Sequence, residues 1–210
     1  MLNIYHAAGT RAFRVIWTCE ELAIPYTLTR VDFSPQYRAT PEWRKLNPVG
    51  KVPVMTDDEL TMFESGAMVQ YILDKYAPGR LQPKAGTHAH ALYLQWSWYA
   101  EATFARPIGE IVNHQRAFGD AAIPEVIAEM QARAQVGTNA VSEAVAERDY
   151  ILGSEFSAAD VMLGYTLMLA NRFVPEAITG PVAQYWERLQ NRPAFAATKA
   201  AETAMPALET

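Results

Sequence analysis

The pattern of apolar residues changes partway along the chain, and this change constrains the fold more than any other feature. Residues 1–80 combine short alternating runs with short helical runs, whereas from about residue 88 we find only helical periodicity. The segment 77–87 between them carries two Pro and two Gly and is typical of a linker. The sequence therefore predicts an α/β part at 1–78, a linker at 79–87 and an all-helical part at 88–210.

The first part has a characteristic order of elements. The residues predict a strand at 2–5, a helix at about 10–23, a strand at 26–31, a short helix that begins near Thr40, a hairpin of 52–55 and 60–63, and a helix from 64 to about 76. A strand, a helix and a second strand joined by short turns indicate a βαβ unit. The whole order, β-α-β-α-β-β-α, is that of a thioredoxin-like sandwich.

The second part is predicted to be helical throughout. One of its helices opens with Ser157 and has Asp160 three residues later, which is a variant of the capping box with Asp in place of Glu. The apolar residues that follow indicate that this helix is central and buried. The predicted helices lie near 88–117, 123–148, 157–172, 180–191 and 193–203.

Composition excludes several classes of function. The formal net charge of −5 argues against a general nucleic-acid binder. No apolar run approaches the roughly 18 residues that a membrane span needs, and the first residues lack the features of a signal peptide. The single cysteine, Cys19, excludes an internal disulfide and a cysteine-based zinc site, and its surroundings predict a buried small hydrophobe. We therefore expect a soluble cytoplasmic protein.

Short motifs occur in a fixed order across both parts. They are Thr10-Arg-Ala-Phe-Arg-Val15, Gly50-Lys-Val-Pro53, Phe63-Glu-Ser65, Phe156-Ser-Ala-Ala-Asp160 and Asn191-Arg-Pro-Ala-Phe195. With this order and these separations, the chain resembles the cytosolic glutathione transferase family over nearly its whole length. The resemblance implies a thioredoxin-like domain at 1–78 that binds glutathione, and a helical domain at 88–210 that contributes the pocket for an electrophile.

The Val52–Pro53 pair is expected to bind the peptide backbone of glutathione. In this fold the bond would be cis, which leaves the N–H and C=O of Val52 free to pair with an extended peptide, like an added strand. The alternative is a trans proline at the start of a strand.

Glu64 and Ser65 lie at the predicted beginning of a helix, where free N–H groups and the helix dipole favour an anion. The resemblance implies that the N–H and hydroxyl of Ser65 bind the γ-glutamyl carboxylate and that Glu64 pairs with its ammonium group. The alternative is that Glu64 or Ser65 only caps the helix.

Four further side chains are candidates for binding glutathione. Tyr37, Arg38 and Lys51 lie where the family places groups that meet the glycine carboxylate, although such residues are more commonly solvated. Arg11 is expected either to hold a ligand carboxylate or to form an ion pair that stabilises the fold.

The reaction requires a thiolate, because the thiol is a poor nucleophile. Related classes use a Tyr at the end of the first strand, or a Ser or Cys in the loop that follows. Here that loop contains Ala7 and no Cys, which disfavours thioltransferase chemistry. The remaining catalytic candidates are Thr10, whose alternative role is a helix cap, and Tyr5, whose alternative role is a core aromatic. His6 is a weaker candidate for a base.

The resemblance places the apolar acceptor pocket against the first long helix of the second part. Its candidate lining residues are Tyr99, Thr103 and Phe104. Aromatic residues on a helix are also typical of an ordinary core, and this alternative must apply to some of the aromatic residues nearby.

These observations predict a glutathione transferase that joins the thiolate to a small apolar electrophile, as in detoxification. No metal or other cofactor is implied, since glutathione is a co-substrate, and family members usually form a homodimer. The alternatives are a non-catalytic glutathione-binding or regulatory module, favoured by Ala7, or another glutathione-dependent reaction such as isomerisation, peroxide reduction, dehalogenation or ether cleavage.

Overall fold

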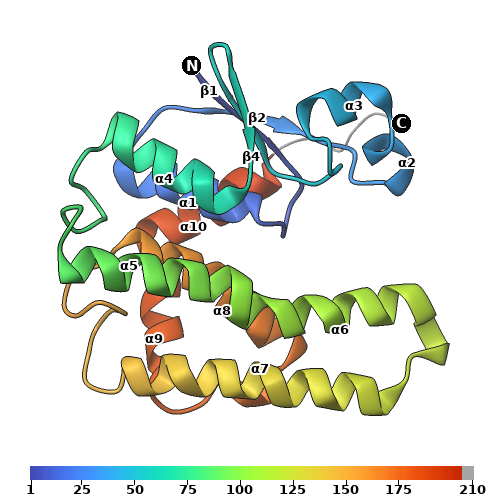
Figure 1. Ribbon diagram of the computed structural model, residues 1–210, viewed down its shortest axis with the longest axis vertical. Helices are drawn as coiled ribbons and strands as arrows, with labels where there is room; N and C mark the ends of the chain where they lie inside the picture. The colour runs from blue at the N-terminus through green and yellow to red at the C-terminus, as the bar shows by residue number, and fades with distance from the viewer. Residues whose placement is uncertain (205–210) are drawn as a thin grey trace. The chain divides into compact units, whose positions relative to one another are not determined.

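The computed structural model describes residues 1–204. These form two compact units, one that runs from Met1 to Arg80 and resumes at Asn191, and one that runs from Leu81 to Gln190. The sequence predicted a single helical domain at 88–210, and the structure differs at its end, because the last helix packs on the first helix of the chain (Figure 1).

The first unit contains a four-stranded mixed sheet with the order β2-β1-β3-β4. β1 (Leu2–His6) is parallel to β2 (Thr27–Arg30) and antiparallel to β3 (Val54–Asp57), which is antiparallel to β4 (Leu60–Phe63). The helices of this unit are α1 (Ala12–Leu22), α2 (Pro35–Arg38), α3 (Pro41–Leu46), α4 (Ser65–Tyr76) and α10 (Pro193–Thr203). The predicted thioredoxin-like fold is confirmed.

The two faces of β1 differ in burial because successive side chains point to opposite sides of a strand. Leu2 and Ile4 are buried, whereas Tyr5 on the other face is half-buried. Trp43 of α3 covers this second face, and its ring lies edge-on to Tyr5 with the centroids 6.0 Å apart. Ala7, Val31, Val52, Val54 and Leu46 complete a small apolar cluster there.

Helix α10 is fixed to α1 by aromatic packing and by an ion pair. The Phe195 ring lies 5.1 Å from Phe13 and 5.0 Å from Trp17, measured between centroids. Arg192 donates to both carboxylate oxygens of Glu21, at 2.6 and 2.7 Å. Phe195 therefore belongs to the core of the first unit, although the whole second unit, Leu81–Gln190, separates it in sequence from the rest of that unit.

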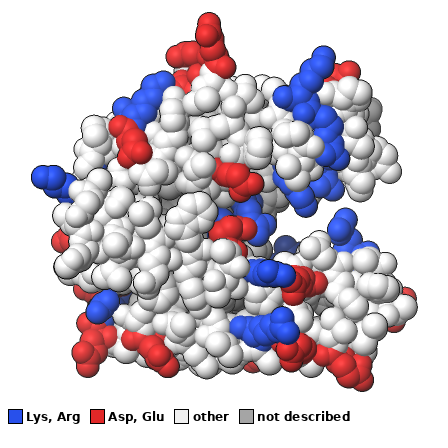
Figure 2. All heavy atoms as spheres, viewed as in Figure 1, with Lys and Arg blue, Asp and Glu red and all other residues white. Residues whose placement is uncertain are grey.

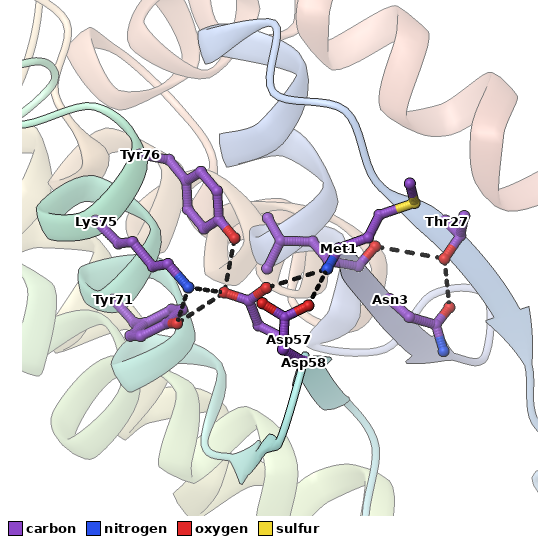
Figure 3. A network of polar contacts seen from close by, with 9 residues as sticks. Met1, Asn3, Thr27, Asp57, Asp58, Tyr71, Lys75 and Tyr76 are labelled. Atoms are coloured by element: carbon purple, nitrogen blue, oxygen red, sulfur yellow. Dashed lines mark hydrogen bonds and ion pairs between the residues drawn. The ribbon is translucent and has the colours of Figure 1, made fainter.

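At the far end of β3, Asp57 ties the last turns of α4 to the hairpin (Figure 3). Its Oδ2 accepts hydrogen bonds from Tyr71 at 2.7 Å, Lys75 at 2.5 Å and Tyr76 at 2.6 Å, and the Met1 ammonium lies 3.4 Å from Oδ1. Burial alone would raise the pKa of Asp57, but the hydrogen bonds from Lys75 and both tyrosines hold it well below its usual value. This network fixes α4 along the hairpin.

The second unit is helical, as predicted. Its central helix α8 is buried over most of its length. The capping box of Ser157 and Asp160 is present at its beginning, and Tyr185 also donates to Asp160 at 2.7 Å. The segments are α5 (His88–Trp98), η1 (Tyr99–Phe104), α6 (Ala105–Phe118), η2 (Gly119–Ala121), α7 (Pro124–Ala144), α8 (Ala158–Phe173), η3 (Pro175–Ala177) and α9 (Pro181–Gln190).

A π-helical segment, η1, interrupts the long helix that the sequence predicted at 88–117. Pro107 lacks the N–H that would bond to the carbonyl of Thr103, which weakens the regular helical ladder here. The hydroxyl of Thr166 donates to the Ala100 carbonyl at 2.9 Å and supports the segment from α8. Helical periodicity alone gave no sign of this change in hydrogen bonding.

Candidate functional site

Three strands meet in one row of paired residues, Tyr5, Val54 and Phe63. β1 and β4 leave the sheet just after this row, and β3 enters the sheet at it. The adjoining segments therefore lie at the same end of the sheet. They are the loop before α1, the Val52–Pro53 pair and Ser65 at the beginning of α4.

The loop before β3 is held by its own hydrogen bonds. The Asn47 side chain donates to the Lys51 carbonyl and accepts from the Val49 N–H, both at 2.9 Å. Gly50 has a φ of +66°, and a Cβ atom there would lie 2.7 Å from the Arg38 carbonyl oxygen. Only glycine fits this close approach without strain, so the loop delivers Val52 in a defined position.

The Val52–Pro53 bond is cis, as predicted. Val52 is 8% exposed, and its backbone N–H and C=O form no hydrogen bond with any residue between 1 and 204, although Val54 already belongs to the sheet. Backbone groups in such a position are normally paired. The edge beside Val52 therefore offers one donor and one acceptor to an extended segment.

Helix α4 begins at Ser65, directly after a residue with an unusual backbone. Glu64 has a φ of +79°, a region that few residues other than glycine adopt, and its exposed side chain makes no capping hydrogen bond. Ser65 itself is 4% exposed, whereas Ala67 is exposed. The N–H groups of this first turn have no partner within the helix, and together with the helix dipole they favour an anion.

Thr10 lies two residues before the first residue of α1, and its hydroxyl is already engaged. The hydroxyl donates to the Ala7 carbonyl at 2.6 Å, and its oxygen lies 3.5 Å from the N–H of Ala12. Thr10 is partly exposed and stands at the positive end of the helix dipole. Arg11, at the N-cap position of α1, makes no side-chain capping bond.

The other two candidates for thiol activation are Tyr5 and His6. Tyr5 packs on Trp43 within the small apolar cluster, which agrees with its alternative role as a core aromatic. His6 is 1% exposed, and burial, together with the nearby charge of Arg30, lowers its pKa. His6 is therefore buried, and Tyr5 is half-buried.

Lys and Arg side chains gather over α2 and α3, at the upper right of Figure 2. The Arg38 guanidinium lies 4.3 Å above the Phe33 ring and donates from Nε to the Phe33 carbonyl at 3.0 Å. Tyr37 is 38% exposed and lies against Trp43, and Lys51 is exposed. Arg38 lies beside Gly50 of the loop that leads to Val52, and Lys51 belongs to that loop, so both bring positive charge to it.

The three candidates for the electrophile pocket have different environments within the helical unit. Phe104 is fully buried and lies against Gly137 of α7, so the structure places it in the core. Tyr99 is half-buried and donates from its hydroxyl to the Gly137 carbonyl at 2.9 Å. Thr103 is exposed. Their role in binding an electrophile stays a prediction.

Sequence reasoning missed three residues of this region. Arg14 is fully buried and donates to Oγ of Ser65 at 3.3 Å. Glu202 of α10 accepts from the Gly9 N–H at 3.4 Å, and Asn47 organises the loop before Val52. Arg14 lies inside the motif Thr10–Val15, so a charged residue among apolar ones was the available signal; nothing in the sequence near Glu202 pointed to Gly9.

Other chemically relevant groups lie away from these segments. Cys19 is buried in α1, and burial, with a smaller effect of Glu20, raises the pKa of its thiol to about 12, so it is not a reactive cysteine.

Within residues 1–204, no helix is long and apolar enough to cross a bilayer. No group of three or more His, Cys, Asp or Glu in that range is arranged to hold a metal ion.

Comparison with protein families agrees with this geometry. The family described as "Glutathione S-transferase, N-terminal domain" matches residues 1–74, which include β1, the Val52–Pro53 pair and most of α4. Among known proteins, the chain is 25% identical to glutathione S-transferase 3 of Schizosaccharomyces pombe over 186 residues, covering 82% of this chain and 75% of that one. It is also 25% identical to the disulfide-bond oxidoreductase YfcG of Escherichia coli, over 92% of both chains.

A solved structure is similar across both units. A glutathione transferase family member from Pseudomonas fluorescens, with two glutathione molecules bound, matches with a TM-score of 0.83 and 22% identity, covering 94% of this chain and 92% of that one. At this identity the match establishes the fold.

Proposed function

Since the chain belongs to the cytosolic glutathione transferase family, we propose that it is itself a glutathione transferase that joins the thiolate of glutathione to a small apolar electrophile. The single observation on which the proposal rests is the register of the sheet. It brings Val52, whose backbone groups are unpaired, and Ser65, which begins α4, to the same end.

Each part of the tripeptide has a matching group at this end of the sheet. The cysteinyl backbone pairs with the N–H and C=O of Val52 as an added strand. The γ-glutamyl carboxylate binds the first turn of α4 and the hydroxyl of Ser65, and the exposed Glu64 pairs with the ammonium group.

The glycine carboxylate is the remaining charged group of glutathione. The positive charge around α2 and α3 supports an assignment of Lys51, Arg38 and Tyr37 to this carboxylate, because a partly exposed cation or hydroxyl can donate to it. Arg11 is assigned to a carboxylate of the ligand or to Glu64.

Thiol activation is assigned to Thr10 with the positive end of α1. To donate to sulfur, the Thr10 hydroxyl must turn away from the Ala7 carbonyl, and the helix N-terminus then adds to the stabilisation of the thiolate. Lowering the thiol pKa by two units corresponds to about 2.7 kcal/mol. The thiol proton goes to solvent, the sulfur forms a bond to the electrophilic carbon, and the leaving group departs with its electron pair.

The electrophile is assigned to the helical unit, where Thr103 and Tyr99 reach the surface more than Phe104 does. A homodimer in the cytoplasm completes the proposal, as is usual for the family. Neither assignment depends on the geometry around Ser65.

The test combines binding and turnover. Calorimetric titration with glutathione should give saturable binding, and an aryl halide should be converted with release of halide. Ser65→Ala should weaken glutathione binding about tenfold or more. Ser142→Ala in α7 is the matched control and should bind as the parent does. Absence of glutathione binding by the parent would refute the proposal.

A specific observation favours a second candidate. Ala7 has no hydroxyl that could donate to the sulfur, and the Thr10 hydroxyl already donates to the Ala7 carbonyl. The groups that would activate the thiol are therefore less complete than the groups that would bind glutathione. Similarity to a disulfide-bond oxidoreductase also supports a reaction in which glutathione attacks sulfur rather than carbon. Tight binding of glutathione without halide release, but with reduction of a small disulfide, would favour that activity; binding with neither reaction would indicate a non-catalytic module.

A further inference from the structure

We propose that Arg14 is a positioning residue of the glutathione site, which orients the Ser65 hydroxyl toward the α-carboxylate of the γ-glutamyl group. The inference rests on the proposed function, because it concerns how the same site distinguishes ligands. It adds a buried residue of α1 to the groups that the proposed function assigns to this site.

The burial of Arg14 is the first observation. Its side chain, in the first turn of α1, is among the largest fully buried side chains of the described residues, with 0% exposure. Burying a guanidinium costs considerable free energy unless its N–H groups find hydrogen-bond acceptors. α1 packs directly against α4, so this charge lies beside the first turn of α4.

The direction of the hydrogen bond is the second observation. Nη1 of Arg14 lies 3.3 Å from Oγ of Ser65. A guanidinium has only donors, so the serine oxygen must be the acceptor. The single hydroxyl hydrogen of Ser65 is then available to another acceptor, and no residue in the range 1–204 accepts it. Since Ser65 is 4% exposed, a buried donor of this kind calls for a partner, and a ligand carboxylate has the right chemistry.

The electrostatic contribution acts in the same direction. The arginine keeps its positive charge at every pH at which the protein is folded. Its position next to Ser65 adds to the dipole at the beginning of α4, and both effects are stronger away from water than in it. A ligand group that is neutral at this point would gain little from Arg14, whereas a carboxylate would gain from both the charge and the oriented hydroxyl.

The inference therefore predicts selectivity for one chemical group. A suitable probe is the analogue of glutathione in which a 4-aminobutanoyl group replaces γ-glutamyl, because it keeps the amine and lacks only the α-carboxylate. The quantity to measure by calorimetry is the ratio of Kd for this analogue to Kd for glutathione. In the parent this ratio should be about tenfold or more.

Four variants separate orientation from structure. Arg14→Met and Ser65→Ala should each reduce the ratio to within about threefold of unity, and the double variant should reduce it no further, because both substitutions remove one shared contact. Arg14→Lys keeps a charge and a donor but not the planar fork, and should give an intermediate ratio. It also serves if Arg14→Met fails to fold, as judged by circular dichroism.

Arg192→Met is the matched control. Arg192 is the partly buried arginine that ties α10 to α1 through Glu21, so its loss should lower stability and leave the ratio unchanged. The inference is overturned if Ser65→Ala reduces the ratio while the folded Arg14 variants keep that of the parent. If the parent binds neither compound, the proposed function fails first, and that result is distinct from an unchanged ratio.

Discussion

The backbone N–H of Gly9 donates to the carboxylate of Glu202 at 3.4 Å, which joins the loop before α1 to a helix 193 residues further along the chain. The other carboxylate oxygen of Glu202 is buried without a hydrogen-bond partner in the described chain. Burial raises the pKa of Glu202 to about 7, and the hydrogen bond from Gly9 offsets only part of this effect.

Glu202 therefore predicts a dependence of stability on pH. Its pKa is higher in the folded protein than in the unfolded chain. Below about pH 4.5 the carboxyl is protonated in both states and does not change the free energy of unfolding. As pH rises from 4.5 through 7, the unfolded chain loses this proton more readily, so the folded state loses stability. Glu202→Gln keeps an acceptor for Gly9 and removes the titration. At pH 8 this variant should be more stable than the parent by on the order of 2 kcal/mol, and at pH 4.5 equally stable.

Urea denaturation between pH 4.5 and 8 measures this difference. Glu187→Gln, at an exposed position of α9, is the control and should follow the parent at every pH. A constant difference between Glu202→Gln and the parent across the range would contradict the assignment.

The ion pair between Arg192 and Glu21 is expected to stabilise the first unit. Glu21 is 7% and Arg192 24% exposed at their side chains. Arg192→Met leaves a largely buried carboxylate without its cation and should cost about 3 kcal/mol of unfolding free energy. The comparison is Arg106→Met, which breaks an exposed pair with Glu110 and should cost at most about 0.5 kcal/mol. Equal losses in thermal denaturation would show that the pair does not fix α10.

Gly137 allows Phe104 to approach α7 closely. A Cβ atom at Gly137 would lie 2.7 Å from a ring carbon of Phe104, so Gly137→Ala should destabilise the helical unit by about 1–3 kcal/mol through overpacking. Gly109→Ala in α6 meets no atom within 4 Å and should stabilise by about 0.5–1 kcal/mol because alanine favours the helix. Chemical denaturation of both variants checks the opposite signs; a stabilised Gly137→Ala would be incompatible with this packing.

Thr10 is expected to control the thiol of bound glutathione. Thr10→Ala should raise the apparent thiol pKa by about one unit and lower kcat/KM about tenfold, while Thr10→Ser should retain most of both. The ultraviolet absorbance of the thiolate, followed against pH, gives the pKa. Tyr5→Phe should leave it unchanged, because Tyr5 packs on Trp43. A raised pKa in Tyr5→Phe alone would transfer the role to Tyr5, and no change in either variant would exclude both.

Local patterns in the sequence determined most of the secondary structure and one end of the candidate site. Strand alternation at Leu2–His6, the capping box at Ser157 and the Val52–Pro53 motif each depend on residues close together in sequence, so they could be recognised without coordinates. The π-helical segment was missed: Pro107 was visible in the sequence, but the hydrogen bond from Thr166 that supports the segment comes from another helix.

The tertiary structure alone decided which distant residues meet. Residue spacing could not reveal that Arg14 donates to Ser65 or that Glu202 accepts from Gly9. Nor could it reveal that α10 belongs to the first unit and packs on α1. Periodicity reports which face of an element is apolar, but not which other element covers that face. The polar groups buried in such contacts are set by the packing of whole helices, and for that reason only the folded chain identifies them.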